Sequence, residues 1–402
     1  MRLLVVTSRF DLVGGSERYA GEVVRGLRAR GLEVEVLCAG GDQHAGAPLH
    51  ERPELDAPRL GAAAREELRG LLAGFDRVLQ LSWIGAGAQA VVAAGPPWLR
   101  FVQDHTPFCP GLNKQHADGE LCTKTLGAEC LTRYWLRGGC AGLRVEGAPS
   151  LRSPLRALRG RMVELEHLDR ARRVLVASGY MRAELLRCEV DHERVEVLPY
   201  FTRSGTHSLP ATAPPPAAAS FLARPGTTTL FTPARLVLPD KGVDHLLTIL
   251  GRLPESVQLL VAGDGPARPW LEEKADEEGL AQRALFLGWT DPGVTEALYA
   301  ACDLVVFPSV WNEPFGLVGI EAMAHGKPVV AFDVGGVREW LTDGETGALV
   351  ERKDHDGMVH ALTALAADPE GRAALGAAGR ERVERDFRAD GHLDRLEYLL
   401  RA

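Results

Sequence analysis

The chain has 402 residues, 46% of them hydrophobic and 25% charged, which is enough for two α/β domains with sizeable cores. Its net charge of −8 gives no global electrostatic support to a nucleic-acid partner, and it has no apolar run of about 18 residues that would predict a transmembrane helix. The stretch from Met1 to Thr7 lacks a basic leader and a cleavage site, so we expect a cytoplasmic protein with reduced thiols.

The first elements predict a strand at residues 2–7, a turn at Gly14 and Gly15, a helix, and a strand at 32–38. This order opens a doubly wound α/β domain. The two glycines let a phosphate or sugar approach the backbone, and Ser16 can cap the helix, although a plain turn explains the same residues. The three spaced glycines of a dinucleotide fingerprint are missing, which disfavours a dehydrogenase.

Further strands are predicted at residues 77–83 and 98–103, and the second of these leads directly to His105. A histidine at the carboxyl end of a parallel strand faces the ligand crevice of such a domain. A structural histidine is the alternative.

Residues 107–150 form a long, poorly periodic insertion that is rich in glycine and cysteine. Four of its cysteines are Cys109, Cys122, Cys130 and Cys140. Four thiolates can hold a structural zinc ion, with His116 as a substitute ligand, but the Cys-x2-Cys spacing of common zinc sites is absent. Disulfides and free thiols therefore stay open as alternatives.

An arginine-rich helix is predicted from Ser153 to about Arg172. Such a helix usually presents a solvated face. The alternatives are an acidic acceptor and peripheral contact with an anionic membrane surface through residues 152–173. Residues 202–226 are rich in Pro, Ala, Ser and Thr and are interpreted as a linker between two domains.

The second half repeats the α/β alternation. The strand predicted at 228–232 leads to Arg235 and Lys241, and basic groups just beyond a strand's carboxyl end suit a diphosphate. The next strand ends in the turn Gly263, Asp264, Gly265, which allows close approach of a nucleotide. A third strand leads to Trp289.

The strongest signal lies between two predicted strands at 304–307 and 328–332. Pro314 suits the first position of a helix, which places Glu313 at its mouth and Glu321 eight residues further on. Eight residues of helix span roughly 12 Å, too far for two carboxylates acting on one glycosidic bond, which lie roughly 5–10 Å apart. The spacing suits two hydroxyl-bearing groups joined by a diphosphate, although glutamates near a helix start also simply favour the helix dipole.

The stretch Glu313-Pro-Phe-Gly-Leu-x3-Glu321-Ala-Met-Ala, together with Arg235-x5-Lys241-Gly, resembles the retaining glycosyltransferases of family 4. The resemblance implies the α/β GT-B fold, in which two Rossmann-like doubly wound domains face each other across a cleft. The acceptor domain would comprise residues 1–203 with the helix 388–402 packing back onto it, and the donor domain would comprise residues 204–387.

The resemblance also implies residue roles. Arg235 and Lys241 would neutralise the leaving diphosphate, Glu313 would hold sugar hydroxyls, and His105 would complete the catalytic set. Glu321 would hold the ribose hydroxyls. The other implied donor-binding residues are Gly14, Gly15, Gly263, Asp264, Gly265, Trp289, Phe315, Gly316 and Leu317.

The function implied is transfer of a sugar from a nucleoside diphosphate sugar to an acceptor hydroxyl. The anomeric configuration would be retained by a front-face mechanism, and no catalytic metal would be needed. Two other classes stay open. A nucleotide-sugar epimerase would need an acid/base set on the sugar ring, which we cannot identify. A non-catalytic sugar-nucleotide-binding protein could discard Arg235 and Lys241, and both are present.

Overall fold

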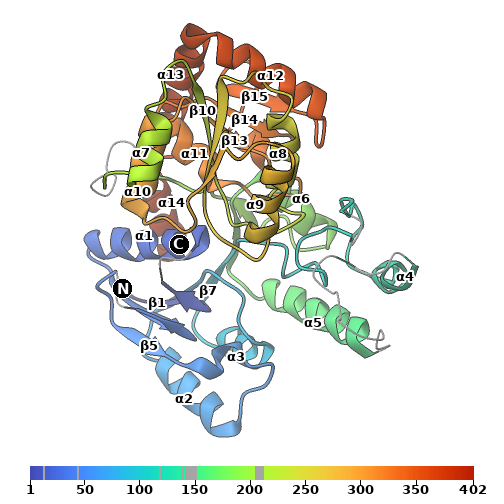
Figure 1. Cartoon of the computed structure of the whole chain (residues 1–402). Coiled ribbons are helices and arrows are strands. Elements are labelled where there is room, and N and C mark those ends of the chain that lie inside the picture. Colours follow the sequence, from blue (N-terminus) through green and yellow to red (C-terminus); the bar gives the residue numbers. More distant parts are fainter. Residues whose placement is uncertain (12–13, 43–44, 117–118, 137–139, 141–151, 204–211) are drawn as a thin grey trace. The chain divides into compact units, whose positions relative to one another are not determined.

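The computed structural model describes residues 1–11, 14–42, 45–116, 119–136, 140, 152–203 and 212–402. These residues divide into two compact units, each built on a parallel sheet covered by helices (Figure 1). Unit 1 comprises Met1–Tyr200 and Ala389–Ala402, and unit 2 comprises Phe201–Arg388. The predicted α/β class is therefore confirmed.

In the described part of unit 1, seven parallel strands form one sheet. Their order is β5 (Leu49–Glu51), β3 (Glu33–Cys38), β1 (Arg2–Val6), β6 (Arg77–Gln80), β7 (Trp98–Val102), β8 (Arg173–Val176) and β9 (Val195–Val197). The apolar run of β1 is completely buried, as expected of a central parallel strand covered on both faces.

The helices of unit 1 surround this sheet. They are α1 (Gly15–Ala29), α2 (Ala62–Leu72), α3 (Ala86–Val92), α4 (Ala128–Leu136), α5 (Arg152–Leu168), α6 (Gly179–Arg187), α14 (Ala389–Arg401) and the 3-10 helix η1 (Pro53–Asp56). A short ladder joins β2 (Arg9–Phe10) to β4 (Gly40–Gly41).

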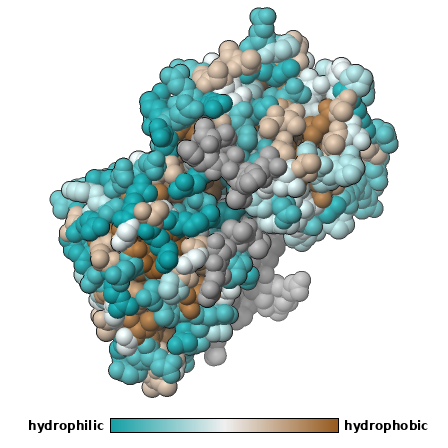
Figure 2. All heavy atoms as spheres, turned by 90° about the vertical axis from the view of Figure 1, so that its left-hand side faces the viewer, coloured by the Kyte–Doolittle hydropathy of each residue, from teal (hydrophilic) through white to brown (hydrophobic). Residues whose placement is uncertain are grey.

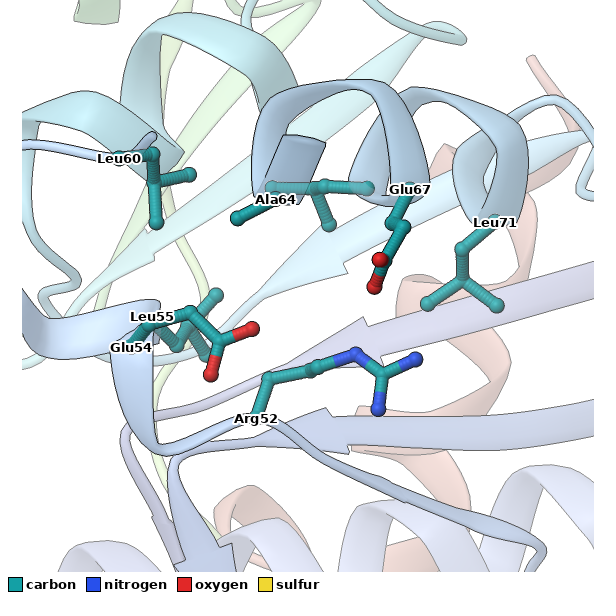
Figure 3. Close-up of a pocket in the computed structure, with 8 residues that line it drawn as sticks. Arg52, Glu54, Leu55, Leu60, Ala64, Glu67 and Leu71 are labelled. Carbon is teal, nitrogen blue, oxygen red and sulfur yellow. The ribbon is translucent and has the colours of Figure 1, made fainter. Parts of the chain in front are cut away.

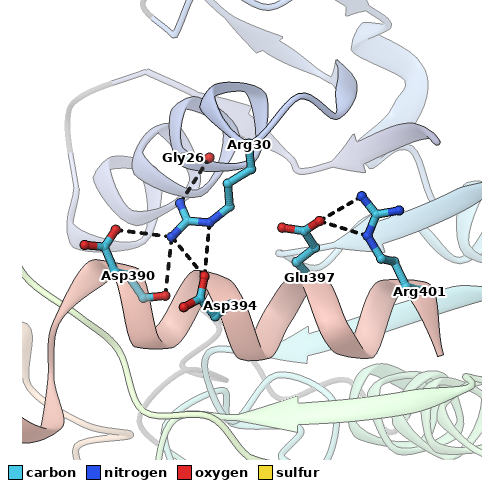
Figure 4. Close-up of polar contacts among 6 residues, drawn as sticks. All are labelled: Gly26, Arg30, Asp390, Asp394, Glu397 and Arg401. Carbon is cyan, nitrogen blue, oxygen red and sulfur yellow. Dashed lines mark hydrogen bonds and ion pairs between the residues drawn. The ribbon is translucent and has the colours of Figure 1, made fainter.

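Helix α14 packs on α1 although the two are far apart in the sequence. A Cβ atom on Gly26 would overlap the Leu393 side chain, so glycine permits the close approach. His392 is buried and its Nε2 lies 2.9 Å from the Tyr19 hydroxyl. At the surface, Arg30 donates to the carboxylates of Asp390 and Asp394 (Figure 4).

In the described part of unit 2, six parallel strands form the sheet. Their order is β12 (Ala284–Phe286), β11 (Val257–Ala262), β10 (Thr228–Pro233), β13 (Leu304–Phe307), β14 (Val329–Phe332) and β15 (Gly347–Val350). Its helices are α7 (Pro216–Leu222), α8 (Val243–Leu250), α9 (Arg268–Glu277), α10 (Pro292–Ala301), α11 (Leu317–Ala324), α12 (His355–Ala367), α13 (Pro369–Asp386) and the 3-10 helix η3 (Val337–Glu339).

Three local predictions were wrong. Helix α11 begins at Leu317 rather than at Pro314, because Gly316 adopts a left-handed conformation with φ of 101° just before it. Ser16 lies within α1 and does not cap it; the capping position belongs to Gly14. The predicted linker contains α7, whose Pro216 starts a helix that buries Phe221. Residues 204–211 of that linker lie outside the described residues.

Among the described residues, the exposed large apolar side chains are Leu112, Leu155, Met162, Trp270, Trp289 and Tyr398. Hydrophilic residues dominate the face shown in Figure 2, with small apolar areas between them. In the ranges given above, no helix combines the length and the apolar character needed to cross a membrane.

Candidate active site

In the sheet of unit 2, β10 and β13 are neighbours, and the strands that follow each of them in the sequence lie on opposite sides of this pair. Strands β11 and β12 lie beyond β10, whereas β14 and β15 lie beyond β13. Ligands of doubly wound sheets bind outside the carboxyl ends of the strands at such a switch point. The segments that follow these two strands contain Arg235, Lys241 and Glu313.

The Glu313 carboxylate is the centre of the contacts at this edge. Its Oε1 atom accepts from Lys241 Nζ at 2.5 Å, from Trp311 Nε1 at 2.6 Å and from Ser309 Oγ at 2.7 Å. Only 7% of the Glu313 side chain is exposed, against 19% for Lys241. A buried carboxylate needs such compensation, and here one cation and two neutral donors supply it.

Glycines fix the backbone around this pair. Gly242 follows Lys241 with φ of 63°, and a Cβ there would overlap the Pro308 carbonyl at the end of β13. Gly335 has φ of 52° and lies against the Glu313 backbone, whose carbonyl accepts from Gly336 N at 2.7 Å. The sequence can adopt this geometry because glycine tolerates left-handed backbone.

The structure does not bring Arg235 into this cluster. Its side chain is exposed, and within the described ranges its guanidinium forms no hydrogen bond or ion pair. Of the predicted phosphate-binding pair, Lys241 contacts Glu313 and Arg235 extends into solvent.

Glu321 lies within α11 and is held by a residue that sequence reasoning missed. The Tyr299 hydroxyl donates to Glu321 Oε2 at 3.1 Å, and Tyr299 is only 1% exposed. The His325 ring stacks on Tyr299 at 5.4 Å, and His325 Nε2 lies 2.8 Å from Glu296 Oε2. Tyr299 occupies a buried position in the helical repeat of α10, as any core residue would. The sequence pattern therefore does not predict its contact with Glu321.

The start of α11 is fixed by packing against Trp340. The indole Nε1 donates to the Phe315 carbonyl at 2.7 Å, and both Trp340 and Phe315 are buried. A Cβ on Gly319 would overlap the Trp340 ring. Leu317 is the first residue of the helix, so the free amides of its first turn lie in the segment between Glu313 and Glu321.

The turns after β10, β11 and β12 interlock. Gly263 and Gly265 have φ of 139° and 158°, and a Cβ on either would overlap the backbone that follows β10. Gly263 N donates to the Gly288 carbonyl at 2.7 Å, and the Asp264 carbonyl accepts from Leu236 N at 2.9 Å. The neighbouring Trp289 leaves 53% of its surface exposed.

In unit 1, Gly14 precedes α1 in an extended conformation and Gly15 is its first residue. His105 lies just beyond β7 and is completely buried. Its Nε2 lies 2.9 Å from the Tyr180 hydroxyl, and its ring packs edge-on against Phe108.

The surroundings keep His105 neutral. Burial, and to a smaller extent the Lys114 ammonium, lower the pKa of His105 to about 3. Lys114 is itself buried and pairs with Glu184 Oε2 at 2.8 Å. The insertion that contains Lys114 is thereby joined to α6, and the imidazole faces protein rather than solvent.

Of the three alternatives for the clustered cysteines, the structure fits free thiols: Cys109, Cys122, Cys130 and Cys140 are not joined in disulfides. Cys109 is buried, and burial raises the pKa of its thiol to about 11. Across the described residues, no three His, Cys, Asp or Glu side chains are gathered to hold a metal ion. Parts of the insertion, including residues 141–150, lie outside the described residues.

A small pocket of unit 1 lies between η1 and α2 (Figure 3). Four leucines and Ala64 line it, together with Arg52, Glu54 and Glu67. None of the predicted site residues lines it.

Comparisons with known proteins agree with the fold and the motif. Residues 14–200 match the model of the glycosyl transferase 4-like domain, and residues 219–382 match that of the glycosyl transferases group 1. The D-inositol 3-phosphate glycosyltransferase of Xylanimonas cellulosilytica is 32% identical over 382 residues, covering 85% of this chain and 91% of that protein.

Solved structures share the whole architecture. The Anabaena protein HepE, crystallised with UDP and glucose, superposes with a TM-score of 0.74 at 19% identity, covering 100% of this chain and 99% of HepE. Sucrose-phosphate synthase of Thermosynechococcus elongatus gives 0.69 at 23% identity, covering 100% and 98%. The two units are thus the two Rossmann-like domains of a GT-B fold. By its sequence, the chain belongs to the group 1 and family 4 glycosyltransferases, and it is a glycosyltransferase.

Proposed function

We propose that this glycosyltransferase moves a sugar from a nucleoside diphosphate sugar to an acceptor hydroxyl and retains the anomeric configuration. The observation that carries the proposal is the contact of Lys241 with Glu313 at the switch point of unit 2, just before the amino end of α11. HepE, which shares the fold, has been crystallised with UDP and with UDP-glucose, which supports a donor of this chemical class.

Unit 2 is the donor domain in this proposal. The Lys241 ammonium and the amides of α11 take the diphosphate, and the exposed Arg235 guanidinium adds a second cation. These groups neutralise the charge that develops on the leaving phosphate. In other transferases a bound metal ion stabilises the same charge. Glu313 holds the sugar hydroxyls and orients the lysine.

The nucleoside lies between Glu321 and the glycine turns. Glu321, fixed by Tyr299, accepts from the ribose hydroxyls. Gly263, Asp264 and Gly265 let the nucleotide approach the backbone, and Trp289 flanks the nucleobase.

Unit 1 is the acceptor domain in this proposal. We assign His105 a role in positioning the substrate and not the role of a general base. A histidine whose pKa lies near 3 is a poor general base at neutral pH. We therefore assign the acceptor's proton to the departing β-phosphate oxygen. The bond from the anomeric carbon to that oxygen breaks, and the acceptor oxygen attacks from the same face.

The deciding test is the anomeric configuration of the first product. Nucleotide sugars are screened for thermal stabilisation of the protein, and the best donor is used for turnover. The proton NMR coupling at the anomeric carbon, taken before mutarotation, should match that of the donor. Inversion would overturn the mechanism, and interconversion of sugars without transfer would indicate an epimerase.

A membrane surface is the partner we propose for α5. Leu155 and Met162 lie seven residues apart on this helix with 54% and 53% of their surfaces exposed. Arg156 and Arg159 are exposed beside them, a combination typical of helices that lie in the interface of anionic lipids. Sedimentation with anionic vesicles should fall when Leu155 and Met162 are both changed to Ser.

The structural zinc ion remains a proposal that rests on cysteine spacing alone. Elemental analysis of protein purified without added metal should give about one zinc per chain if Cys109, Cys122, Cys130 and Cys140 hold it. If the native protein contains no zinc and all four thiols react with a thiol reagent, the zinc proposal is wrong.

A further inference from the structure

Three donors converge on one oxygen atom of Glu313, which is more than that atom can use well at once. Lys241 Nζ, Trp311 Nε1 and Ser309 Oγ lie 2.5, 2.6 and 2.7 Å from its Oε1 atom. A carboxylate oxygen offers about two lone pairs to hydrogen-bond donors. One of the three donors can therefore leave without stripping the carboxylate of its hydrogen bonds. None of the described residues donates to Oε2, so this second oxygen is left for a hydroxyl of a ligand.

The Ser309 hydroxyl has a second acceptor within reach. Its Oγ lies 3.1 Å from the Asp240 carbonyl oxygen, in addition to its contact with the carboxylate. A hydroxyl has one proton to donate, so it serves one of these two acceptors at a time. The Asp240 carbonyl also accepts from Val310 N at 2.9 Å, and it keeps that hydrogen bond when the hydroxyl turns away. The serine can therefore turn toward Glu313 and leave no buried group without a partner.

The Trp311 side chain contacts both charges of the ion pair. Its Nε1 donates to the Glu313 carboxylate, and Lys241 Nζ lies over its ring, 5.0 Å from the ring centre. The face of an indole attracts a cation. The indole N–H can only donate, so its bond to the carboxylate does not depend on where the ammonium lies. Trp311 thus stabilises the two charges together and the carboxylate alone.

Lys241 is the member of this cluster that an anion would take. Its side chain is 19% exposed, whereas that of Glu313 is 7% exposed. A diphosphate carries more negative charge than one carboxylate, so it competes with Glu313 for the ammonium. A buried carboxylate that loses its cation is destabilising unless other donors replace that cation. Here the two neutral donors are already in place.

We propose that Trp311 and Ser309 are positioning residues of the donor site, because they let the lysine pass from the carboxylate to the diphosphate. In the free protein, Lys241 and Trp311 occupy the lone pairs of Oε1, and Ser309 donates to a backbone carbonyl. In the donor complex, Trp311 and Ser309 occupy those lone pairs, and Oε2 accepts from the sugar. The inference rests on the proposed function, since it adds two residues to the same site.

Binding of nucleoside diphosphates without a sugar tests this exchange. UDP, GDP and ADP are titrated calorimetrically into the wild type, W311F and S309A, and into W270F as the matched control. Trp270 is an exposed tryptophan of α9. W311F keeps an aromatic face for the ammonium and removes the N–H donor, whereas S309A removes the hydroxyl.

Each of the two variants should weaken binding of the diphosphate by about tenfold, which is typical of a lost hydrogen bond to a charged group. The free protein keeps two donors on the Glu313 carboxylate in either variant, whereas the complex keeps only one. W311F should also lower kcat with the nucleotide sugar, because the carboxylate that orients the sugar is less firmly held. W270F should bind and turn over as the wild type does.

Removal of the negative charge separates an exchange from simple packing. In E313Q no carboxylate competes for the ammonium, so this variant should bind the diphosphate at least as tightly as the wild type. Hydrogen bonds to a neutral amide are weaker, so W311F/E313Q should bind within about threefold of E313Q. A tryptophan that only packs would have the same effect in both backgrounds. Urea unfolding checks that every variant is folded.

Three results would overturn the exchange. They are binding by W311F and S309A that equals binding by W270F, an equal loss from W311F in both backgrounds, and loss of binding in E313Q. The first would mean that the ammonium contacts the carboxylate and the phosphate together. In all three cases the proposed function survives if the wild type binds one of the diphosphates and transfers the sugar. If the wild type binds none of the three diphosphates, the donor proposal fails and the exchange fails with it.

Discussion

The two units share one architecture but treat their charged groups differently. In unit 2, Lys241 and Glu313 touch each other at the edge of the sheet, and the lysine is partly open to solvent. In unit 1, His105, Lys114 and Glu184 are enclosed beside the corresponding edge. The lysine of unit 2 thus stays partly accessible at the sheet edge, as the proposed contact with a diphosphate requires, whereas the polar groups of unit 1 brace an inserted loop.

The two units should therefore respond differently to mutation, one through the activation free energy of the reaction and the other through the free energy of unfolding. A group that contacts the diphosphate affects turnover, and an enclosed group affects folding first. The predictions that follow test this division between the units, and they run from the largest expected effect to the smallest.

Replacing Lys241 with Ala should lower kcat by at least about a hundredfold. In the proposed donor site the ammonium is the cation that contacts the leaving diphosphate, and such contacts are typically worth about 3 kcal/mol in the transition state. Steady-state kinetics measures the loss. Urea unfolding measures the separate cost of leaving the buried Glu313 carboxylate without its cation. Lys274→Ala, which removes a partly buried lysine of α9 that pairs with Glu278 outside the proposed site, is the matched control. Near-normal kcat in Lys241→Ala would sink the phosphate role.

Acid should destabilise unit 1 through its buried histidines. Burial lowers the pKa of His105 to about 3 and that of His392 to about 4. The unfolded chain takes up protons below about pH 6.5, whereas the folded chain does so only at these lower values. Stability should therefore fall as the pH drops from about 6.5 to 4, by up to about 1.4 kcal/mol per pH unit for each histidine.

Urea unfolding between neutral and acidic pH, with hydrogen exchange to assign each unit, measures this slope. His392→Gln should remove its own share of this slope, whereas His105 and the buried His167, whose pKa burial also lowers, keep theirs. His192→Gln, at an exposed histidine, should leave the slope unchanged. The lowered pKa of His245 adds a smaller effect in unit 2 in the same direction. The contrast between the units breaks down if unit 2 unfolds first on acidification.

Sequence reasoning reached further in unit 2 than in unit 1, and the reason is physical. The strands that flank Glu313 and the turn at Gly263 follow from short apolar runs and from glycines that the backbone requires. The Tyr299 contact with Glu321 depends on how α10 packs against α11, which no local pattern records. The burial of His105 likewise depends on the inserted loop, whose residues have little periodicity.

Tyr299→Phe should raise the KM for the donor by about fivefold to tenfold and change kcat less. The phenyl ring keeps the packing, and only the hydroxyl that holds Glu321 is lost, at about 1 kcal/mol. Donor titrations in steady-state kinetics measure the change. Tyr398→Phe, at an exposed position of α14, is the control. An unchanged KM would mean that Glu321 needs no support from Tyr299.

The smallest expected effect concerns the ion pairs that join α14 to α1 (Figure 4). Arg30 Nη2 lies 3.2 Å from Asp390 Oδ1 and 3.3 Å from Asp394 Oδ1, but both carboxylates are largely exposed. Arg401 lies on the same helix as these aspartates, and among the residues that the structure describes it pairs only with Glu397, one turn away. Water and salt screen such pairs, so each contributes at most about 1 kcal/mol.

Arg30→Gln should therefore lower the free energy of unfolding by about 0.5 to 1 kcal/mol, and Arg401→Gln by about 0.3 kcal/mol. The difference arises because Arg30 links two helices of unit 1, whereas Arg401 links two turns of one helix. Urea unfolding at low and at high salt measures both, and the Arg30 effect should shrink at high salt. A loss above about 2 kcal/mol that persists in salt would contradict this account. It would mean that the charges, rather than the packing of Leu393 on Gly26, hold α14 in unit 1.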